Sequence, residues 1–264
     1  MRGLRRAGAL LTCQCGRRYP VIAGIPIVLR ELGDWAESEG ADAMRDRRLP
    51  GELVELLAVD GASRRNRRLL AVYGAEVGDS PLHAWLADFV TSAQGPVLEV
   101  GAGRGHAGTV RMDLNLELLR AGAAPPELVE TAEGIALAPG AALVADATDP
   151  PFSAGSFATV LLANVLDSCR DPALVLAQSD ALVAPGGQLA VTCAFAFDET
   201  ITPRPLWFGP EELDAALAGT RPFGGYDLEC RLDAEALELE WRLQVAPRSA
   251  HLHRVRVRTA RRPG

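Results

Sequence analysis

The sequence predicts an α/β fold built on a mostly parallel sheet, and three observations support this prediction. Apolar runs typical of buried strands alternate with helical segments along the second half of the chain. One such run, residues 97–100, leads directly into a loop with glycines at positions 101, 103 and 105. Acidic residues follow the ends of later strand-like runs, where open α/β sheets bind their ligands.

Composition limits the classes of protein to which the chain can belong. It has 264 residues, 48% of them hydrophobic, and a formal net charge of −7. This length is enough for one sizeable core, or for one domain with an appendage. The negative charge disfavours broad contact with a nucleic-acid backbone. No stretch reaches the roughly 20 apolar residues of a membrane helix, and no signal-peptide pattern opens the chain. We therefore expect a cytoplasmic protein that does not contact membranes.

Residues 8–30 predict short strands separated by turns. The motifs Cys15-Gly16, Tyr19-Pro20 and Gly24-Ile25-Pro26 resemble the second half of the small zinc-ribbon proteins that accompany methyltransferases. Structural zinc requires four ligands, usually in spaced pairs, whereas this segment offers only Cys13 and Cys15. We expect two small thiols in a β-hairpin and no metal. The alternative is zinc bound with ligands that a second chain supplies.

The next segment, residues 33–93, is predicted to be a helical cap between a first part, 1–32, and a main domain, 94–264. Residues 34–50 predict a loop or a frayed helix, and residues 51–73 predict two short amphipathic helices. A helix over 80–93 begins at Ser80-Pro81. An arginine run between residues 64 and 68 is either a solvated helix face or a contact for an acidic substrate. Three residues are candidates for a pocket lining, and each could equally be ordinary packing: Tyr73, His83 and Trp85.

The glycine loop is followed by a strand over residues 109–113 with Asp113 at its tip. A fixed carboxylate there can accept hydrogen bonds from both hydroxyls of a ribose, which gives this position a binding role. Asp113 follows Gly105 by only eight residues, whereas dinucleotide folds place this acid about 20 residues beyond the glycines. We therefore expect a crossover without a full helix. The alternative for Asp113 is that it caps the next helix.

Later segments continue the α/β order. Strands are predicted over 142–145, 156–163 and 188–194, and helices over 116–121 and 210–217, with a further helix opening at Asp171-Pro172. Asn164 and Asp167 follow the fourth strand and should lie at the ligand edge of the sheet. The segments 237–246 and 250–260 alternate apolar and polar residues, which indicates antiparallel strands.

The glycine loop, Asp113, the segment Asp146-Ala147 and the segment 185–187 occur in the order typical of class I S-adenosylmethionine-dependent methyltransferases. The chain resembles this family over roughly residues 80–260. The resemblance implies a Rossmann-like seven-stranded sheet with an antiparallel last strand, and S-adenosylmethionine as cofactor. It implies a cofactor-binding set consisting of Glu99, Gly101, Ala102, Gly103, Gly105, Asp113, Leu114, Asp146, Ala147 and Asn164.

The resemblance implies methyl transfer to an O- or N-nucleophile on a small molecule or peptide. Alignment of the reactants can supply most of the catalysis, and a general base would help an acceptor of high pKa. His106 is the first choice for this base, followed by Asp167 and His83. Two alternatives remain: an inactive scaffold that has lost productive cofactor binding, and a nicotinamide-dependent oxidoreductase.

A crossover without a helix should leave apolar surface on one side of the sheet, which a monomer rarely exposes as a large patch. We expect this surface to be covered either by residues 8–30 or by a second copy of the chain, which would make the protein a homodimer.

Overall fold

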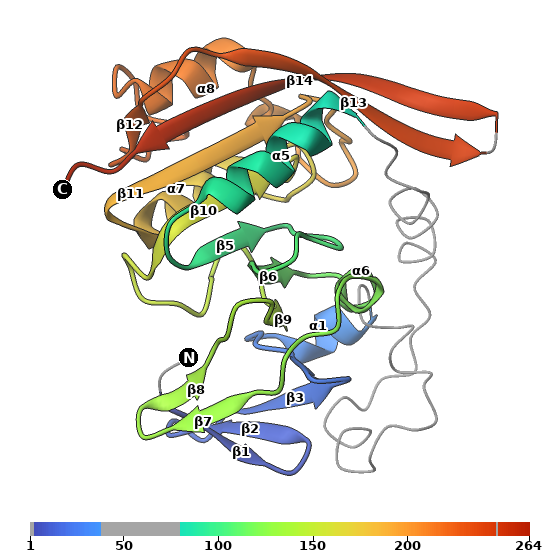
Figure 1. Cartoon of the computed structure of the whole chain (residues 1–264), viewed down its shortest axis with the longest axis vertical. Helices are drawn as coiled ribbons and strands as arrows, with labels where there is room; N and C mark the ends of the chain where they lie inside the picture. The colour runs from blue at the N-terminus through green and yellow to red at the C-terminus, as the bar shows by residue number, and fades with distance from the viewer. Residues whose placement is uncertain (1–2, 38–79, 247) are drawn as a thin grey trace. The chain divides into compact units, whose positions relative to one another are not determined.

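The structure, a computed structural model, describes residues 3–37, 80–246 and 248–264 (Figure 1). Its contacts group the chain into two compact units. The first unit contains Met1–Glu76 and Ala102–Asp146, and the second contains Val77–Gly101 and Ala147–Gly264. The helices predicted over 51–73, with the arginine run and Tyr73, lie outside the described residues. The division into segments 1–32, 33–93 and 94–264 stays a prediction.

The second unit is built on a sheet whose central strands are parallel. These strands are β5 (Val97–Val100), β10 (Phe157–Ala163) and β11 (Val183–Cys193). The last strand, β14 (Ser249–Arg261), pairs with β11 in the antiparallel direction, as predicted. Two further strands pair with β14, namely β12 (Arg231–Leu232) and β13 (Leu237–Ala246). The expected α/β fold class is thus confirmed.

Each helix of this unit begins at a proline, whose fixed φ suits the first helical turn. They are α5 (Pro81–Ser92), α7 (Pro172–Leu182) and α8 (Pro210–Leu217), with a short 3₁₀ turn at Arg204–Leu206. The side chain of Asp171 caps α7 by accepting a 3.0 Å hydrogen bond from the N–H of Leu174. None of the helices in the described ranges has the length and apolar character needed to cross a membrane.

Helix α5 lies along the sheet through one apolar face. Leu82 and Leu86 are buried against Leu161, Val255 and Val257. Burial of a leucine side chain contributes roughly 1.5–3 kcal/mol, so these two residues help to hold the helix on the sheet, together with the partly buried Trp85, Phe89 and Val90. Figure 1 shows α5 running in the opposite direction to β11, which places its first turn at the edge where β11 ends.

The start of β11 differs from the prediction. The sequence indicates that residues 185–187 form a turn after α7 and that the strand begins at 188, whereas the strand begins at Val183. Residues 184–187 form a bulge, because Phe157 pairs with Val183 and Thr159 pairs next with Gln188. Gly186 permits this bulge through its φ of +74°. Its N–H donates to the carbonyl of Arg262 at 3.1 Å, which satisfies the bulged backbone.

The first unit contains two parallel strands and a short helix. They are β6 (Val110–Asp113), β9 (Ala142–Val144) and α6 (Leu116–Ala121).

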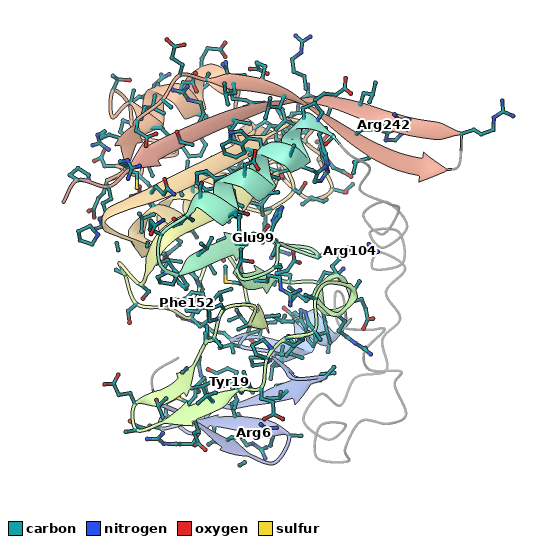
Figure 2. The ribbon with its side chains drawn as sticks, in the orientation of Figure 1. Arg6, Tyr19, Glu99, Arg104, Phe152 and Arg242 are labelled. Carbon is teal, nitrogen blue, oxygen red and sulfur yellow. The ribbon has the colours of Figure 1, made fainter. Side chains whose placement is uncertain are left out.

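The N-terminal part forms an antiparallel sheet, and a separate hairpin packs beside it. The sheet comprises β1 (Leu4–Ala7), β2 (Leu10–Cys13), β3 (Arg18–Ile22) and β4 (Ile25–Pro26), and the hairpin comprises β7 (Val129–Thr131) and β8 (Gly134–Ala136). Figure 2 labels Arg6 and Tyr19 on this sheet.

The N-terminal segment packs against apolar residues of α6 and β9. That it covers the surface left by the missing crossover helix stays a prediction. Ile25, Ile27 and Leu29 share one buried cluster with Leu119 and Val144. Trp35 joins this cluster from helix α1 (Leu32–Glu37). For residues 34–50, the prediction of a loop or frayed helix holds in its helical form as far as Glu37, where Trp35 and Ala36 are buried in the cluster. Residues 38–50 lie outside the described residues.

Candidate functional site

The connection between β5 and β6 is short, as its spacing predicts. Residues 101–109 form turns and no helix. The N–H of Gly105 donates to the carbonyl of Ala102 at 2.7 Å, and the N–H of Thr109 donates to that of His106 at 3.4 Å. The prediction of a crossover without a full helix is confirmed.

A buried arginine replaces the missing helix as the support of this loop. Arg111 lies in β6 and is only 1% exposed. Its guanidinium donates to the carbonyls of Arg104 at 3.1 Å, Leu119 at 3.4 Å, Ala123 at 2.5 Å and Gly140 at 3.3 Å. These bonds join the glycine loop, the end of α6 and the approach to β9. Sequence reading missed this role, although an arginine within an otherwise apolar strand is an indication of it.

The carboxylate of Asp113 is oriented by two backbone groups of the first unit. Its Oδ2 accepts from the N–H of Gly103 at 2.8 Å, and its Oδ1 accepts from the N–H of Asn115 at 2.7 Å. Asn115, rather than Asp113, caps α6 by accepting from the N–H of Leu118 at 3.0 Å. Both oxygens of Asp113 are thus held by backbone N–H groups, one in the glycine loop and one at the start of α6.

The second acid follows the neighbouring parallel strand. Asp113 pairs with Val144, and Asp146 lies two residues beyond that partner. The N–H of Ala145 donates to the backbone carbonyl of Asp113 at 3.2 Å. Asp113 and Asp146 therefore come from the carboxyl ends of adjacent parallel strands, where α/β folds bind ligands. Leu114, the next candidate, is 39% exposed.

Two glycines of the loop have different physical roles. Gly101 has a φ of +64°, and a Cβ built on it would lie 2.4 Å from Cγ2 of Val165. It is therefore required for packing within the second unit. Gly103 has a φ of +56°, and a Cβ built there would meet no atom within 4 Å. The space beside Gly103 can admit a ligand to the backbone.

Two strands of the second unit end in residues with left-handed backbone. Asn164 follows β10 with a φ of +53°, and Phe195 follows β11 by two residues with a φ of +54°. Thr192 holds Asn164 through a 3.0 Å hydrogen bond from its Oγ1 to Oδ1 of Asn164. Positive φ is strained for a bulky residue, and such strain concentrates at functional sites. Asn164 was predicted at this edge, whereas nothing in the sequence indicated Phe195.

Asp167 connects the loops that follow these two strands. Its carboxylate accepts from the N–H of Ala196 at 3.0 Å and is 4% exposed. Burial raises the pKa of the Asp167 carboxyl, and backbone N–H groups only partly oppose that effect. Burial also raises the pKa of the neighbouring Cys193 thiol. The structure thus places Asp167 in the interior between the two loops.

The two histidine candidates lie in different units. His83 is in the first turn of α5, where its Nδ1 lies 2.7 Å from Oγ of the buried Ser80. His106 is half-buried in the turn after the glycines, and its carbonyl accepts from Oγ1 of Thr109 at 2.9 Å. Ser80 therefore fixes the ring of His83 directly, whereas the Thr109 hydroxyl holds the backbone of His106.

The remaining candidates divide between the units in the same way. Glu99 of β5 is 1% exposed and belongs to the second unit with Gly101, Ala147 and Asn164. Ala102, Gly103, Gly105, Asp113, Leu114 and Asp146 belong to the first unit. The structure brings together Gly103 and Asp113 by a hydrogen bond, and it brings Asp146 next to them through the β6–β9 pairing.

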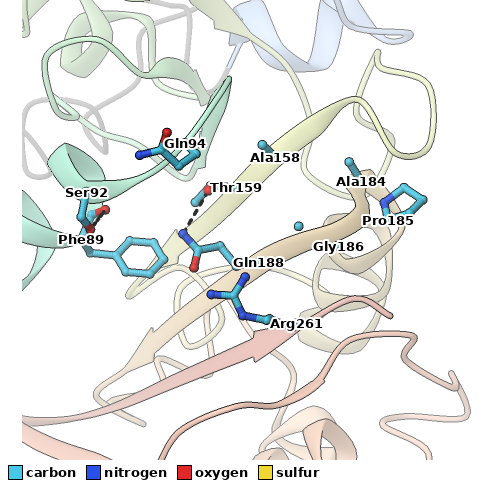
Figure 3. Close-up of a pocket in the computed structure, with 11 residues that line it drawn as sticks. Phe89, Ser92, Gln94, Ala158, Thr159, Ala184, Pro185, Gly186, Gln188 and Arg261 are labelled. Carbon is cyan, nitrogen blue, oxygen red and sulfur yellow. Dashed lines mark hydrogen bonds between the residues drawn. The ribbon is translucent and has the colours of Figure 1, made fainter. Parts of the chain in front are cut away.

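A groove of about 410 Å³ lies elsewhere in the second unit (Figure 3). It is lined by Phe89 of α5, by Thr159 of β10, by Gln188 just after the bulge of β11, and by Arg261 of β14. Nε2 of Gln188 donates to Oγ1 of Thr159 at 3.2 Å. The groove is at the amino-terminal edge of the parallel strands, opposite the edge that carries Asn164 and Asp167.

Of the two N-terminal cysteines, Cys13 is the last residue of β2 and Cys15 lies in the turn between β2 and β3. The N–H of Cys15 approaches Sγ of Cys13 at 3.3 Å, and a hydrogen bond with the Cys13 thiol lowers the pKa of Cys15. Across residues 3–37, 80–246 and 248–264, no three His, Cys, Asp or Glu side chains gather as a metal site.

Comparison with known families bears on this geometry. Residues 98–191 match the family model described as a methyltransferase domain. This part of the chain is similar to methyltransferase domains. It includes β5, β6, β9, β10 and most of β11, together with the glycine loop, both acids and Asn164. The predicted resemblance to the class I family is thereby confirmed, while the zinc-ribbon resemblance of the N-terminal segment stays a prediction.

Solved structures similar to the chain include an S-adenosylmethionine-dependent methyltransferase from Methanosarcina mazei. It shares 16% identity over 69% of this chain and 97% of that chain, with a TM-score of 0.45. A structure reported for the conversion of a disulfide bond into a thioacetal group during echinomycin biosynthesis shares 18% identity over 72% and 83% of the two chains, with a TM-score of 0.46. A complex containing the Haloferax volcanii Trm112 methyltransferase activator gives 12% identity, 76% and 94% coverage, and a TM-score of 0.41. No curated protein sequence matches the chain.

Proposed function

We propose that the chain is an S-adenosylmethionine-dependent methyltransferase that acts on a small molecule or a peptide. The observation that carries this proposal is the orientation of Asp113 by the N–H groups of Gly103 and Asn115. An ionised carboxylate only accepts hydrogen bonds, so one fixed in this way suits the two hydroxyl donors of a ribose. The open space beside Gly103 suits the close approach of a cofactor to the backbone.

The residues of the chain would divide the work of binding. Asp113 would hold the ribose, Asp146 and the N–H of Ala147 would hold the adenine, and Glu99 with the glycine loop would hold the methionine part. S-adenosylmethionine supplies an already activated methyl group when it is bound. The protein therefore needs mainly to align an acceptor, an effect that can supply about 7–11 kcal/mol.

Among the three candidate bases, the contacts favour His83. Its ring is fixed by Ser80, and its helix begins at the edge of the second unit where the parallel strands end. Asp167 is buried and accepts from the Ala196 backbone, which suits a positioning role. His106 remains the third candidate. A base at this edge would accept the proton from an O- or N-acceptor during methyl transfer.

Calorimetric titration with S-adenosylhomocysteine tests the proposal, with a parallel titration of NADH. We expect one S-adenosylhomocysteine per chain and no heat from NADH. Binding of NADH alone would favour the oxidoreductase alternative. Absence of binding at millimolar S-adenosylhomocysteine would favour the inactive scaffold, which the short 101–109 connection motivates.

A further inference from the structure

Trp35, which lies outside the methyltransferase match, contacts the segment that carries Asp113. It belongs to α1, is 4% exposed, and packs in a buried cluster with Ile27, Leu116 and Val144. Its indole Nε1–H donates to the carbonyl of Leu114 at 2.7 Å. All of these residues belong to the first unit.

The carbonyl that Trp35 holds is part of the peptide between Leu114 and Asn115. The N–H of that same peptide donates to Oδ1 of Asp113 at 2.7 Å. A peptide group is planar, so its C=O and N–H turn together. The indole therefore fixes one end of the peptide whose other end orients the carboxylate of Asp113.

A second contact connects the N-terminal segment to the neighbouring acid-bearing strand. The N–H of Val28 donates to the carbonyl of Val144 at 2.8 Å, and Ile27 forms a parallel bridge with Val144. Asp146 follows Val144 by two residues. The segment 25–36 thus contacts the backbone next to both Asp113 and Asp146.

We propose that Trp35 is a positioning residue for cofactor binding, acting through the Leu114–Asn115 peptide on the carboxylate of Asp113. This inference rests on the proposed function. It extends that function by making cofactor affinity depend on an N-terminal segment outside the methyltransferase match. The role of Trp35 is distinct from simple packing, because packing requires the ring but not its N–H.

The test compares Trp35→Phe, which keeps an aromatic ring and removes the donor, with Leu29→Ala. Leu29 lies in the same buried cluster, and its truncation removes packing without removing the bond to Leu114. Two quantities are measured on the full chain: the Kd for S-adenosylhomocysteine by calorimetry, and the exchange rates of the Gly103 and Asn115 amides by NMR without ligand. The melting temperature of each variant gives its loss of stability.

We expect Trp35→Phe to weaken binding about three- to tenfold, the range for one lost hydrogen bond, and to speed exchange of the Asn115 amide. Leu29→Ala should lower the melting temperature at least as much as Trp35→Phe does. Its Kd for S-adenosylhomocysteine should stay within about twofold of that of the unmodified protein. 3-Benzothienylalanine at position 35, which has the shape of tryptophan without the N–H, should reproduce the effect of phenylalanine.

Unchanged Kd and unchanged amide exchange in both position-35 variants would overturn the inference. So would equal loss of affinity in Leu29→Ala, which would show a general effect of stability. Failure of the unmodified protein to bind S-adenosylhomocysteine would refute the proposed function instead. In that case, the exchange of the Asn115 amide in the ligand-free variants still decides whether Trp35 orients Asp113.

Discussion

The carboxylate of Asp113 and the backbone N–H of Gly103 are joined by a 2.8 Å hydrogen bond across the shortened crossover. This bond connects the tip of β6 to the glycine loop without an intervening helix. The loop and the acid are therefore fixed relative to each other before any ligand binds. Pre-arrangement of this kind reduces the ordering cost of binding.

The acid at the tip of β6 and the acid that follows β9 should contribute most of the side-chain binding energy for S-adenosylhomocysteine. Asp113→Ala and Asp146→Ala should each weaken binding by about 1.5–3 kcal/mol, the range for hydrogen bonds to a charged group. Asp149→Ala is the matched control, because Asp149 is an exposed acid three residues beyond Asp146. Calorimetry on the three variants measures the differences, and equal losses in all three would contradict the assignment.

Removal of the Arg111 guanidinium should destabilise the first unit strongly. Arg111→Met removes the guanidinium donor from the carbonyls of Arg104, Ala123 and Gly140, while the carbonyl of Leu119 keeps the N–H of Gly122. Each buried unsatisfied group costs about 1–3 kcal/mol. We expect a loss of at least about 3 kcal/mol in urea unfolding. Arg120→Met is the control, because Arg120 forms a partly exposed pair with Glu117, and such pairs contribute about 1 kcal/mol or less. Similar losses in the two variants would show that Arg111 is not the support of the loop.

The buried Asp167 should give stability a specific pH dependence. Its pKa is raised in the folded protein, mainly by burial, so the folded state binds this proton more tightly than the unfolded state. Its contribution to the free energy of unfolding therefore falls as the pH rises from about 3.9, the ordinary aspartate pKa, through the raised value.

Asp167→Asn removes this titration and keeps an oxygen that can accept from Ala196. Denaturant unfolding should find the variant at least as stable as the unmodified protein at pH 7, with the difference shrinking towards pH 4. A variant that is less stable than the unmodified protein at pH 7, with that deficit shrinking towards pH 4, would show that the charged form is favoured in the folded state.

Deletion of residues 1–32 should make the protein aggregate or melt at a lower temperature. The deletion removes Ile25 and Ile27 from the cluster that covers α6 and β9, and their burial alone contributes about 3–6 kcal/mol. Light scattering and thermal melting measure the effect. The control is a double variant of the exposed Arg17 and Arg18 to alanine, which should behave as the full chain does. A soluble truncated chain of unchanged melting temperature would rule out the N-terminal cover.

The sequence predicts those parts of the molecule that local rules determine. Pro172 after Asp171 identifies the start of α7, and the eight-residue spacing before Asp113 identifies the helix-free crossover. Residues whose roles depend on distant contacts were missed. Arg111 contacts carbonyls up to 29 residues away, and Trp35 contacts one 79 residues away. The bulge before Gln188 was likewise missed, because the local sequence around Gly186 is compatible with either a turn or a bulge.

A crystal structure of the chain with S-adenosylhomocysteine tests the central claim most directly. We predict that both ribose hydroxyls donate to the carboxylate of Asp113, with the Gly103–Asp113 hydrogen bond retained, and that the adenine lies against Asp146. A ligand whose ribose contacts neither oxygen of Asp113 would contradict the account.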